Sequence, residues 1–166
     1  MWVWCQKVLY FIINAGFKIV GRDLTDDIFQ SIMQFVKFGI VGVSNTVISY
    51  VIYVIGLILL QKIHFLPQYD YLLAQIAAFV LSVLWSFYWN NKMVFTLEAG
   101  AKRSVGKALI KTFVSYSFTG LFLSSILLFL WVNVLEISEF IAPLINLLVT
   151  VPLNFLINKF WAFKQT

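Results

Sequence analysis

The sequence predicts an all-α integral membrane protein: four transmembrane helices in two parallel-repeat hairpins, preceded by an amphipathic N-terminal helical segment. The composition is 61% hydrophobic and 11% charged, whereas a soluble protein carries about 25% charged residues. A hydrocarbon core about 30 Å thick requires about 20 helical residues. Four apolar stretches meet that length, and they cover approximately residues 38–60, 71–89, 112–134 and 141–161.

The positive charges predict the orientation of these helices. Eleven of the twelve Lys and Arg residues lie before the first stretch, between the second and third, or at the end of the fourth, and only Lys62 lies on the other side. Lys and Arg stay on the cytoplasmic side of a membrane. We therefore expect a multi-pass protein of the cytoplasmic membrane with both termini in the cytoplasm. Cations beside membrane spans favour anionic membrane lipids as partners and not nucleic acid.

Residues 1–34 predict a cytoplasmic or interfacial amphipathic helical segment, and residues 35–166 the four-span domain. Polar residues interrupt the apolar runs of Trp2–Val20, so we expect this part to lie on the membrane surface; a fifth span is the alternative. The acidic segment Asp23–Asp27 is typical of a helix start, because carboxylates stabilise the positive end of a helix. Apolar residues follow it at helical spacing and lead into the first span.

The second and fourth spans end alike, which indicates an internal repeat. A shift of 68 residues places Ser82 on Thr150, Ser86 on Asn154, Asn90 on Asn158 and Phe95 on Phe163. The chain is therefore predicted to contain two copies of a two-helix hairpin in one orientation, an arrangement found in transport proteins. Chance similarity between apolar spans is the alternative explanation.

Polar side chains recur along the spans at intervals of four residues, which puts them on one helix face. The fourth span carries a continuous stripe of such residues: Asn146, Thr150, Asn154 and Asn158. Such residues either join helices by hydrogen bonds or line a path along which a polar substrate crosses the membrane. The middle of each span lacks Asp, Glu, Lys, Arg and His, which argues against a proton-coupled drug exporter. We likewise expect no metal site, no cofactor and no enzymatic activity.

The cytoplasmic ends of the spans bring amides and cations to the same depth. Asn90 and Lys92 match Asn158 and Lys159, and Lys37 and Lys111 begin the first and third spans. Lys attracts an anion, and Asn forms hydrogen bonds without the cost of burying a charge, so together they could hold a phosphate and the hydroxyls of a sugar. The alternative is that the lysines simply extend towards the headgroups within an aromatic belt.

Three sequence blocks resemble the GtrA-like family of small four-span membrane proteins. The first is Phe35–Thr46, which contains an aromatic and basic start, Val-Gly and Asn-Thr. The second is Asn90–Phe95, similar to the family's N-x-x-x-V-F signature, and the third is Asn154–Phe163, similar to its N-K/R-x-W-x-F ending. The resemblance extends from about Phe35 to the C-terminus.

The resemblance implies translocation of a polyprenyl-phosphate-linked sugar across the cytoplasmic membrane, for cell-envelope polysaccharide synthesis or glycosylation. The alternative is a non-transporting partner of a polyprenyl-phosphate glycosyltransferase, which would bind through surface residues such as Lys102, Arg103 and Lys107. Because four helices enclose little volume, we expect a homodimer. In the translocation hypothesis the headgroup is received by Asn90, Lys92, Asn158 and Lys159, steered by Lys37 and Lys111, and passed along Asn45 and Asn154.

Overall fold

The structure is a computed structural model that describes residues 2–19, 21–64, 67, 69–97, 100–138 and 141–165. Every regular element in these residues is helical, as predicted. The chain forms two compact units, Met1–Val36 and Lys37–Thr166. The predicted outer loops, about 61–70 and 135–140, lie partly outside the described residues, as does Val20 of the predicted surface segment.

The first unit contains helix α1 (Trp2–Ile19) and the first turns of helix α2 (Asp26–Ile63). Gly21 lies beyond the end of α1, and its φ of +70° is the left-handed conformation that glycine adopts most readily. The backbone N–H of Arg22 donates to the carbonyl of Phe17 at 3.0 Å and so closes the last turn. The predicted start of α2 is confirmed, because Thr25 Oγ1 accepts a hydrogen bond from the Ile28 N–H at 3.4 Å.

A small apolar core joins the helices of the first unit. Leu9, Ile13 and Phe17 of α1 pack against a buried cluster that contains Phe29 and Met33. Other apolar residues in the same turns of α1 are exposed: Phe11 is 75% exposed. The N-terminal helix is therefore present as predicted, and its exposed apolar side chains are those expected of a helix at a membrane surface.

Among the described residues, four helices are long and apolar enough to cross a membrane. The first is α2. The second is α3 (Asp70–Trp89) with the π-helical turn η1 (Asn90–Val94), and the fourth is α6 (Ala142–Ile157) with the π-helical turn η4 (Asn158–Ala162). The third runs without interruption through α4 (Val105–Ser117), η2 (Phe118–Leu123), α5 (Ser124–Phe129) and η3 (Leu130–Val134).

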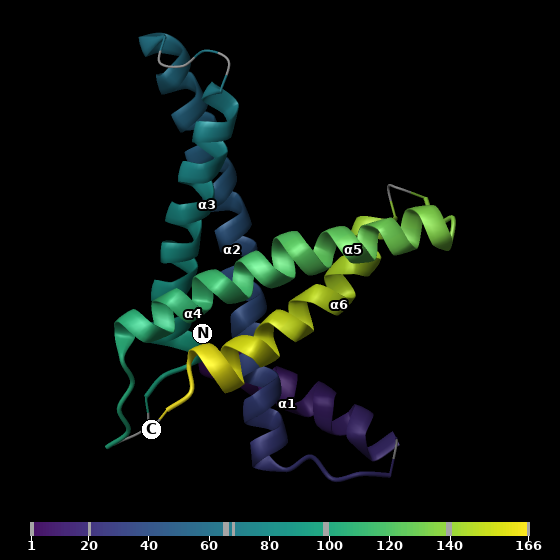
Figure 1. The fold of residues 1–166 in the computed structure, drawn as a ribbon. Coiled ribbons are helices and arrows are strands. Elements are labelled where there is room, and N and C mark those ends of the chain that lie inside the picture. Colours follow the sequence, from purple (N-terminus) through teal and green to yellow (C-terminus); the bar gives the residue numbers. More distant parts are fainter. Residues whose placement is uncertain are drawn as a thin grey trace. The chain divides into compact units, whose positions relative to one another are not determined.

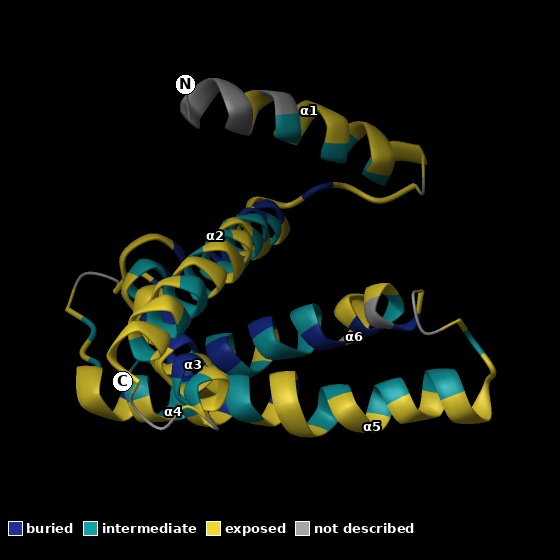
Figure 2. Ribbon diagram, turned by 90° about the horizontal axis from the view of Figure 1, so that it is seen from above, coloured by how far each residue is buried: buried dark blue, intermediate teal, exposed yellow. Residues whose placement is uncertain are grey.

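The four helices pair as two hairpins, which diverge from the end where α4 meets α3 (Figure 1). In the first hairpin the close approach of α2 and α3 is at Gly56, where an added Cβ would lie 3.6 Å from the Ala74 Cβ. In the second, Asn146 Nδ2 of α6 donates to Ser124 Oγ of α5 at 2.6 Å. Exposed residues cover much of α5, whereas buried residues follow α6 (Figure 2). The outer faces therefore suit contact with lipid.

The π-helical turns η1 and η4 support the predicted repeat, because they begin and end 68 residues apart. Each closes with the same hydrogen bond: the Phe95 N–H donates to the Asn90 carbonyl at 2.7 Å, and the Phe163 N–H to the Asn158 carbonyl at 2.8 Å. The common motif is thus a backbone geometry as well as a sequence pattern. π-helical turns are rare and are frequent at functional sites.

Four buried phenylalanines join the hairpins at this end, and we call them the phenylalanine stack: Phe87, Phe95, Phe155 and Phe163. The Phe95 and Phe163 rings stack with their centroids 4.6 Å apart. Phe87 stacks on Phe163 at 5.6 Å, and the equivalent pair, Phe95 and Phe155, at 5.9 Å. The repeats therefore contact each other through matching residues in matching ways.

Candidate functional site

The structure separates the predicted site residues into buried amides, surface cations and one side chain in a groove. Asn90 is fully buried at the end of α3. Its Nδ2 donates to Ser86 Oγ at 3.1 Å and to the Tyr116 hydroxyl of α4 at 3.4 Å. Ser86 and Tyr116 share a further hydrogen bond at 2.6 Å. Asn90 therefore joins α3 to α4 in this arrangement.

Asn158 occupies the equivalent position in the second hairpin and is also fully buried. Its Nδ2 donates to Ser115 Oγ of α4 at 3.1 Å and to Asn154 Oδ1 at 3.0 Å. Ser115 Oγ in turn donates to Asn154 Oδ1 at 2.8 Å. The stripe on α6 thus faces its own hairpin partner and makes the helix-joining bonds of the alternative interpretation.

The buried amides are only partly satisfied. Within the described residues, the Oδ1 atoms of Asn90 and Asn158 are buried without a hydrogen-bond partner. A headgroup could reach them only if the helices separated, since neither side chain has exposed surface. The role of Asn90, Asn154 and Asn158 in receiving or passing a headgroup stays a prediction, and for Asn90 and Asn158 it requires that separation.

The predicted lysines lie against the aromatic belt. Lys92 Nζ donates to the Tyr88 hydroxyl at 3.3 Å. Lys111 Nζ donates to the Trp161 carbonyl at 3.1 Å and lies 5.4 Å from the centre of its ring. Cations near aromatic faces are stabilised by the ring quadrupole.

Two further lysines complete the cationic end of the second unit. Lys159 Nζ lies 5.7 Å from the Phe155 ring centre and 5.8 Å from that of Phe160. Lys37 is half-buried and precedes Phe38, whose ring packs 5.5 Å from that of Phe155. The predicted cations therefore gather at the end of the second unit that contains the phenylalanine stack.

Arg103 has a role that the sequence did not predict. Its Nη1 donates to the Phe163 carbonyl at 3.0 Å, and its Nη2 donates to the Phe95 carbonyl at 2.9 Å and to Asn91 Oδ1. Its guanidinium also lies 4.9 Å from the Phe163 ring centre. Burial lowers the pKa of Arg103, because the charged group loses hydration there. One side chain of the connector thus binds the repeat-equivalent carbonyls of both hairpins.

A signal for this role was present in the sequence. Only two of the twelve basic residues, Arg22 and Arg103, are arginines. A planar guanidinium with five N–H donors can bind several acceptors at once, which a lysine ammonium does less well. An arginine within a lysine-rich connector was therefore the residue to single out.

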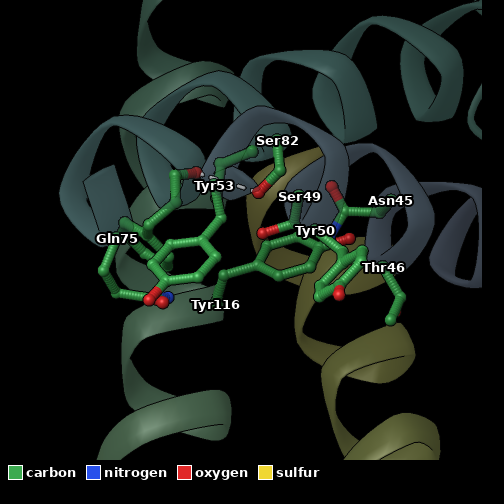
Figure 3. A pocket seen from close by; sticks show the side chains of 10 residues that line it. Asn45, Thr46, Ser49, Tyr50, Tyr53, Gln75, Ser82 and Tyr116 are labelled. Carbon is green, nitrogen blue, oxygen red and sulfur yellow. Dashed lines mark hydrogen bonds between the residues drawn. The ribbon is translucent and has the colours of Figure 1, made fainter. Parts of the chain in front are cut away.

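The second feature that the sequence did not predict is a groove between α2 and α3, with a cavity volume of about 560 Å³. Ten residues line it: Asn45, Thr46, Ser49, Tyr50 and Tyr53 of α2, Gln75, Phe79, Ser82 and Val83 of α3, and Tyr116 of α4. The labelled side chains converge from these helices on one space (Figure 3). The α2 residues lie three and four apart, so they share one helix face.

The lining of the groove is polar but uncharged. Eight of the ten side chains carry a hydroxyl or an amide, and none of the ten is Asp, Glu, Lys, Arg or His. Within the described residues, Ser49, Tyr50, Tyr53 and Gln75 make no hydrogen bond, and Asn45 Oδ1 is buried without a partner. All lie inside the two spans, where lipid supplies no hydrogen bonds. The groove therefore presents unused donors and acceptors at membrane depth.

Comparison with known proteins identifies the domain. Residues 37–163 match the family described as GtrA/DPMS, transmembrane domain. No curated protein and no solved structure matches the chain. The matched range contains the groove, the lysines and both π-helical turns, and it leaves out α1. This chain is a membrane protein that belongs to the GtrA/DPMS transmembrane-domain family.

Proposed function

We propose that this protein carries a polyprenyl-phosphate-linked sugar across the cytoplasmic membrane. Membership of the GtrA/DPMS family supports a membrane protein of polyprenyl-phosphate sugar pathways. The observation that carries the finer proposal is the groove, because it is a polar, uncharged surface inside two membrane spans. Such a surface is costly in hydrocarbon unless a polar molecule occupies it.

The groove suits a molecule with a polar head and a long apolar tail. Tyr50 at its margin is 69% exposed, so the groove opens at the outer surface of the helices, where lipid lies. The prenyl chain can therefore stay in the bilayer while only the headgroup enters the groove. The hydroxyls and amides of the lining then replace the hydrogen bonds that the headgroup loses on leaving water.

The lysines provide the point at which the anionic lipid first binds. Lys92, Lys111 and Lys159 lie at one end of the second unit, among the belt aromatics. In the proposed orientation this end is cytoplasmic and both termini lie in the cytoplasm. A phosphate would gather there by charge attraction. Because the groove lining contains no Asp, Glu, Lys, Arg or His to couple to protons, translocation would be downhill and reversible.

A leaflet assay tests this function. Vesicles containing the purified full chain and a radiolabelled polyprenyl-phosphate hexose are treated with periodate, which is membrane-impermeant and cleaves the sugar of the outer leaflet only. With wild-type protein we expect loss of nearly all intact lipid, and in protein-free vesicles loss of about half. Tyr53→Leu should slow the loss of intact lipid nearly to that of protein-free vesicles, because it removes a groove hydroxyl and an aromatic face.

Tyr71→Leu is the matched control, since Tyr71 is an exposed residue of α3 that does not line the groove. It should translocate like the wild type. Half loss with folded wild-type protein would refute the translocation proposal and favour the glycosyltransferase-partner role. Equal translocation rates for Tyr53→Leu and wild type would show that the headgroup does not pass through the groove.

A further inference from the structure

We propose that the groove is the site of the sugar itself, and that it selects sugars without an ionised group. The proposal rests on the function proposed above and names the part of the substrate that the groove binds. It follows from three properties of the lining: its unused hydrogen-bonding groups, its aromatic rings and its lack of charge.

The unused groups match the chemistry of a monosaccharide. A sugar hydroxyl both donates and accepts hydrogen bonds, as do the Ser49 hydroxyl and the Gln75 amide. Asn45 also lines the groove; its Oδ1 is a buried acceptor without a partner, and a sugar hydroxyl donates to it only once that side chain turns into the groove. A phosphate has acceptor oxygens only and cannot donate to Asn45 when fully ionised.

The aromatic rings provide apolar surface for the other face of a sugar. Tyr50, Tyr53 and Tyr116 come from two different helices and line the same space. A tyrosine combines an apolar ring with a hydroxyl that seeks a hydrogen bond, so it suits a ligand with C–H faces and hydroxyl edges. The cavity volume of about 560 Å³ lies within the range of about 300–1,000 Å³ typical of small-molecule sites.

The lack of charge provides the selectivity. The lining contains no Asp, Glu, Lys, Arg or His, so an ammonium or carboxylate on the sugar would lose its hydration without gaining a counter-charge. Burying an unpaired charge costs far more than burying a hydrogen-bonded hydroxyl. The groove should therefore bind a neutral sugar and reject its charged analogues.

The test measures binding separately from translocation. Three lipids carry the same polyprenyl phosphate and differ only at sugar carbon 6: glucose, 6-amino-6-deoxyglucose and glucuronic acid. Each competes with radiolabelled glucose lipid for the detergent-solubilised full chain near pH 7. We expect the glucose lipid to bind at least tenfold more tightly than either charged lipid.

Gln75→Glu should reduce the difference in binding affinity between the glucose and amino-sugar lipids several-fold, because it places in the groove a carboxylate that can pair with the ammonium. Gln75 is exposed, so the change does not disturb a packed core. Gln61→Glu is the matched control, at an exposed position of α2 outside the groove. It should leave the ratio of the two lipid affinities unchanged.

The results separate this inference from the proposed function. Equal wild-type affinities for the three lipids would overturn the inference, even if the periodate assay shows translocation. The same shift with Gln75→Glu and Gln61→Glu would also overturn it. A tenfold preference for the neutral lipid would support it, and absence of translocation would then count against the proposed function alone.

Discussion

Removing the guanidinium of Arg103 should loosen the joint between the two hairpins. Arg103→Ala deletes the donors to the Phe95 and Phe163 carbonyls and to Asn91 Oδ1, together with the contact to the Phe163 ring. It leaves in place the phenylalanine stack, whose rings also contact one another. The protein should still fold and insert, but with lower stability.

The structure supports a rough magnitude for the loss. A hydrogen bond from a charged donor contributes roughly 1.5–3 kcal/mol when well desolvated. Arg103 is half-buried and its donors share two nitrogens, so we expect a total of about 2–4 kcal/mol and not the full sum. For a chain of this length that corresponds to a fall in Tm of roughly 5–15 °C. Arg103→Lys should recover less than half of the stability lost in Arg103→Ala, because an ammonium cannot bind all three acceptors.

Tryptophan fluorescence during heating in detergent measures this Tm. Lys107→Ala is the control, since Lys107 is an exposed cation of the first turn of α4. Asn91→Ala should add little to Arg103→Ala, because both remove the same interaction. If Arg103→Ala has the same Tm as Lys107→Ala, the guanidinium does not hold the hairpins together, and the predicted role of Arg103 is wrong.

Three further predictions concern packing and topology. Asn158→Leu should lower the Tm, since it removes buried helix-joining hydrogen bonds that contribute roughly 0.6–2 kcal/mol each; lost translocation with an unchanged Tm would instead assign Asn158 to the headgroup path. Gly56→Ala should leave the Tm unchanged or slightly raised, because its Cβ makes ordinary contact with Ala74, whereas Gly56→Leu should lower it. In a Cys5→Ser background, His64→Cys should react with an impermeant maleimide added outside the cell, and reaction from the cytoplasmic side only would reverse the orientation.

The helices were predictable because hydropathy and length determine a membrane span. The predicted stretch 71–89 corresponds to α3, Asp70–Trp89. The third helix starts earlier than predicted, at Val105, because its first turns carry Lys107 and Lys111 and appear too polar to span. A helix can continue into the headgroup region, and hydropathy detects only its apolar part.

The geometry that matters for function was not predictable in the same way. π-helical turns depend on a shift of backbone hydrogen bonds, to which side-chain polarity is a poor guide. Tyr50 and Tyr53 counted as apolar residues of the first span, although their hydroxyls help to make the groove polar. Arg103 counted as a surface charge: its residue type marked it out among the lysines, but the linear sequence did not show that the connector lies beside two helix ends 68 residues apart.

The Arg103 contacts also bear on how such a protein can arise. Phe95 and Phe163 stack on each other as equivalent residues do across the two-fold axis of a homodimer. In a true homodimer every side chain near that axis occurs twice, so two guanidinium groups would compete for the same two carbonyls and repel each other. A fused chain has one connector and can supply one arginine to both halves. Gene fusion therefore permits a joint that two separate copies of the hairpin could not build.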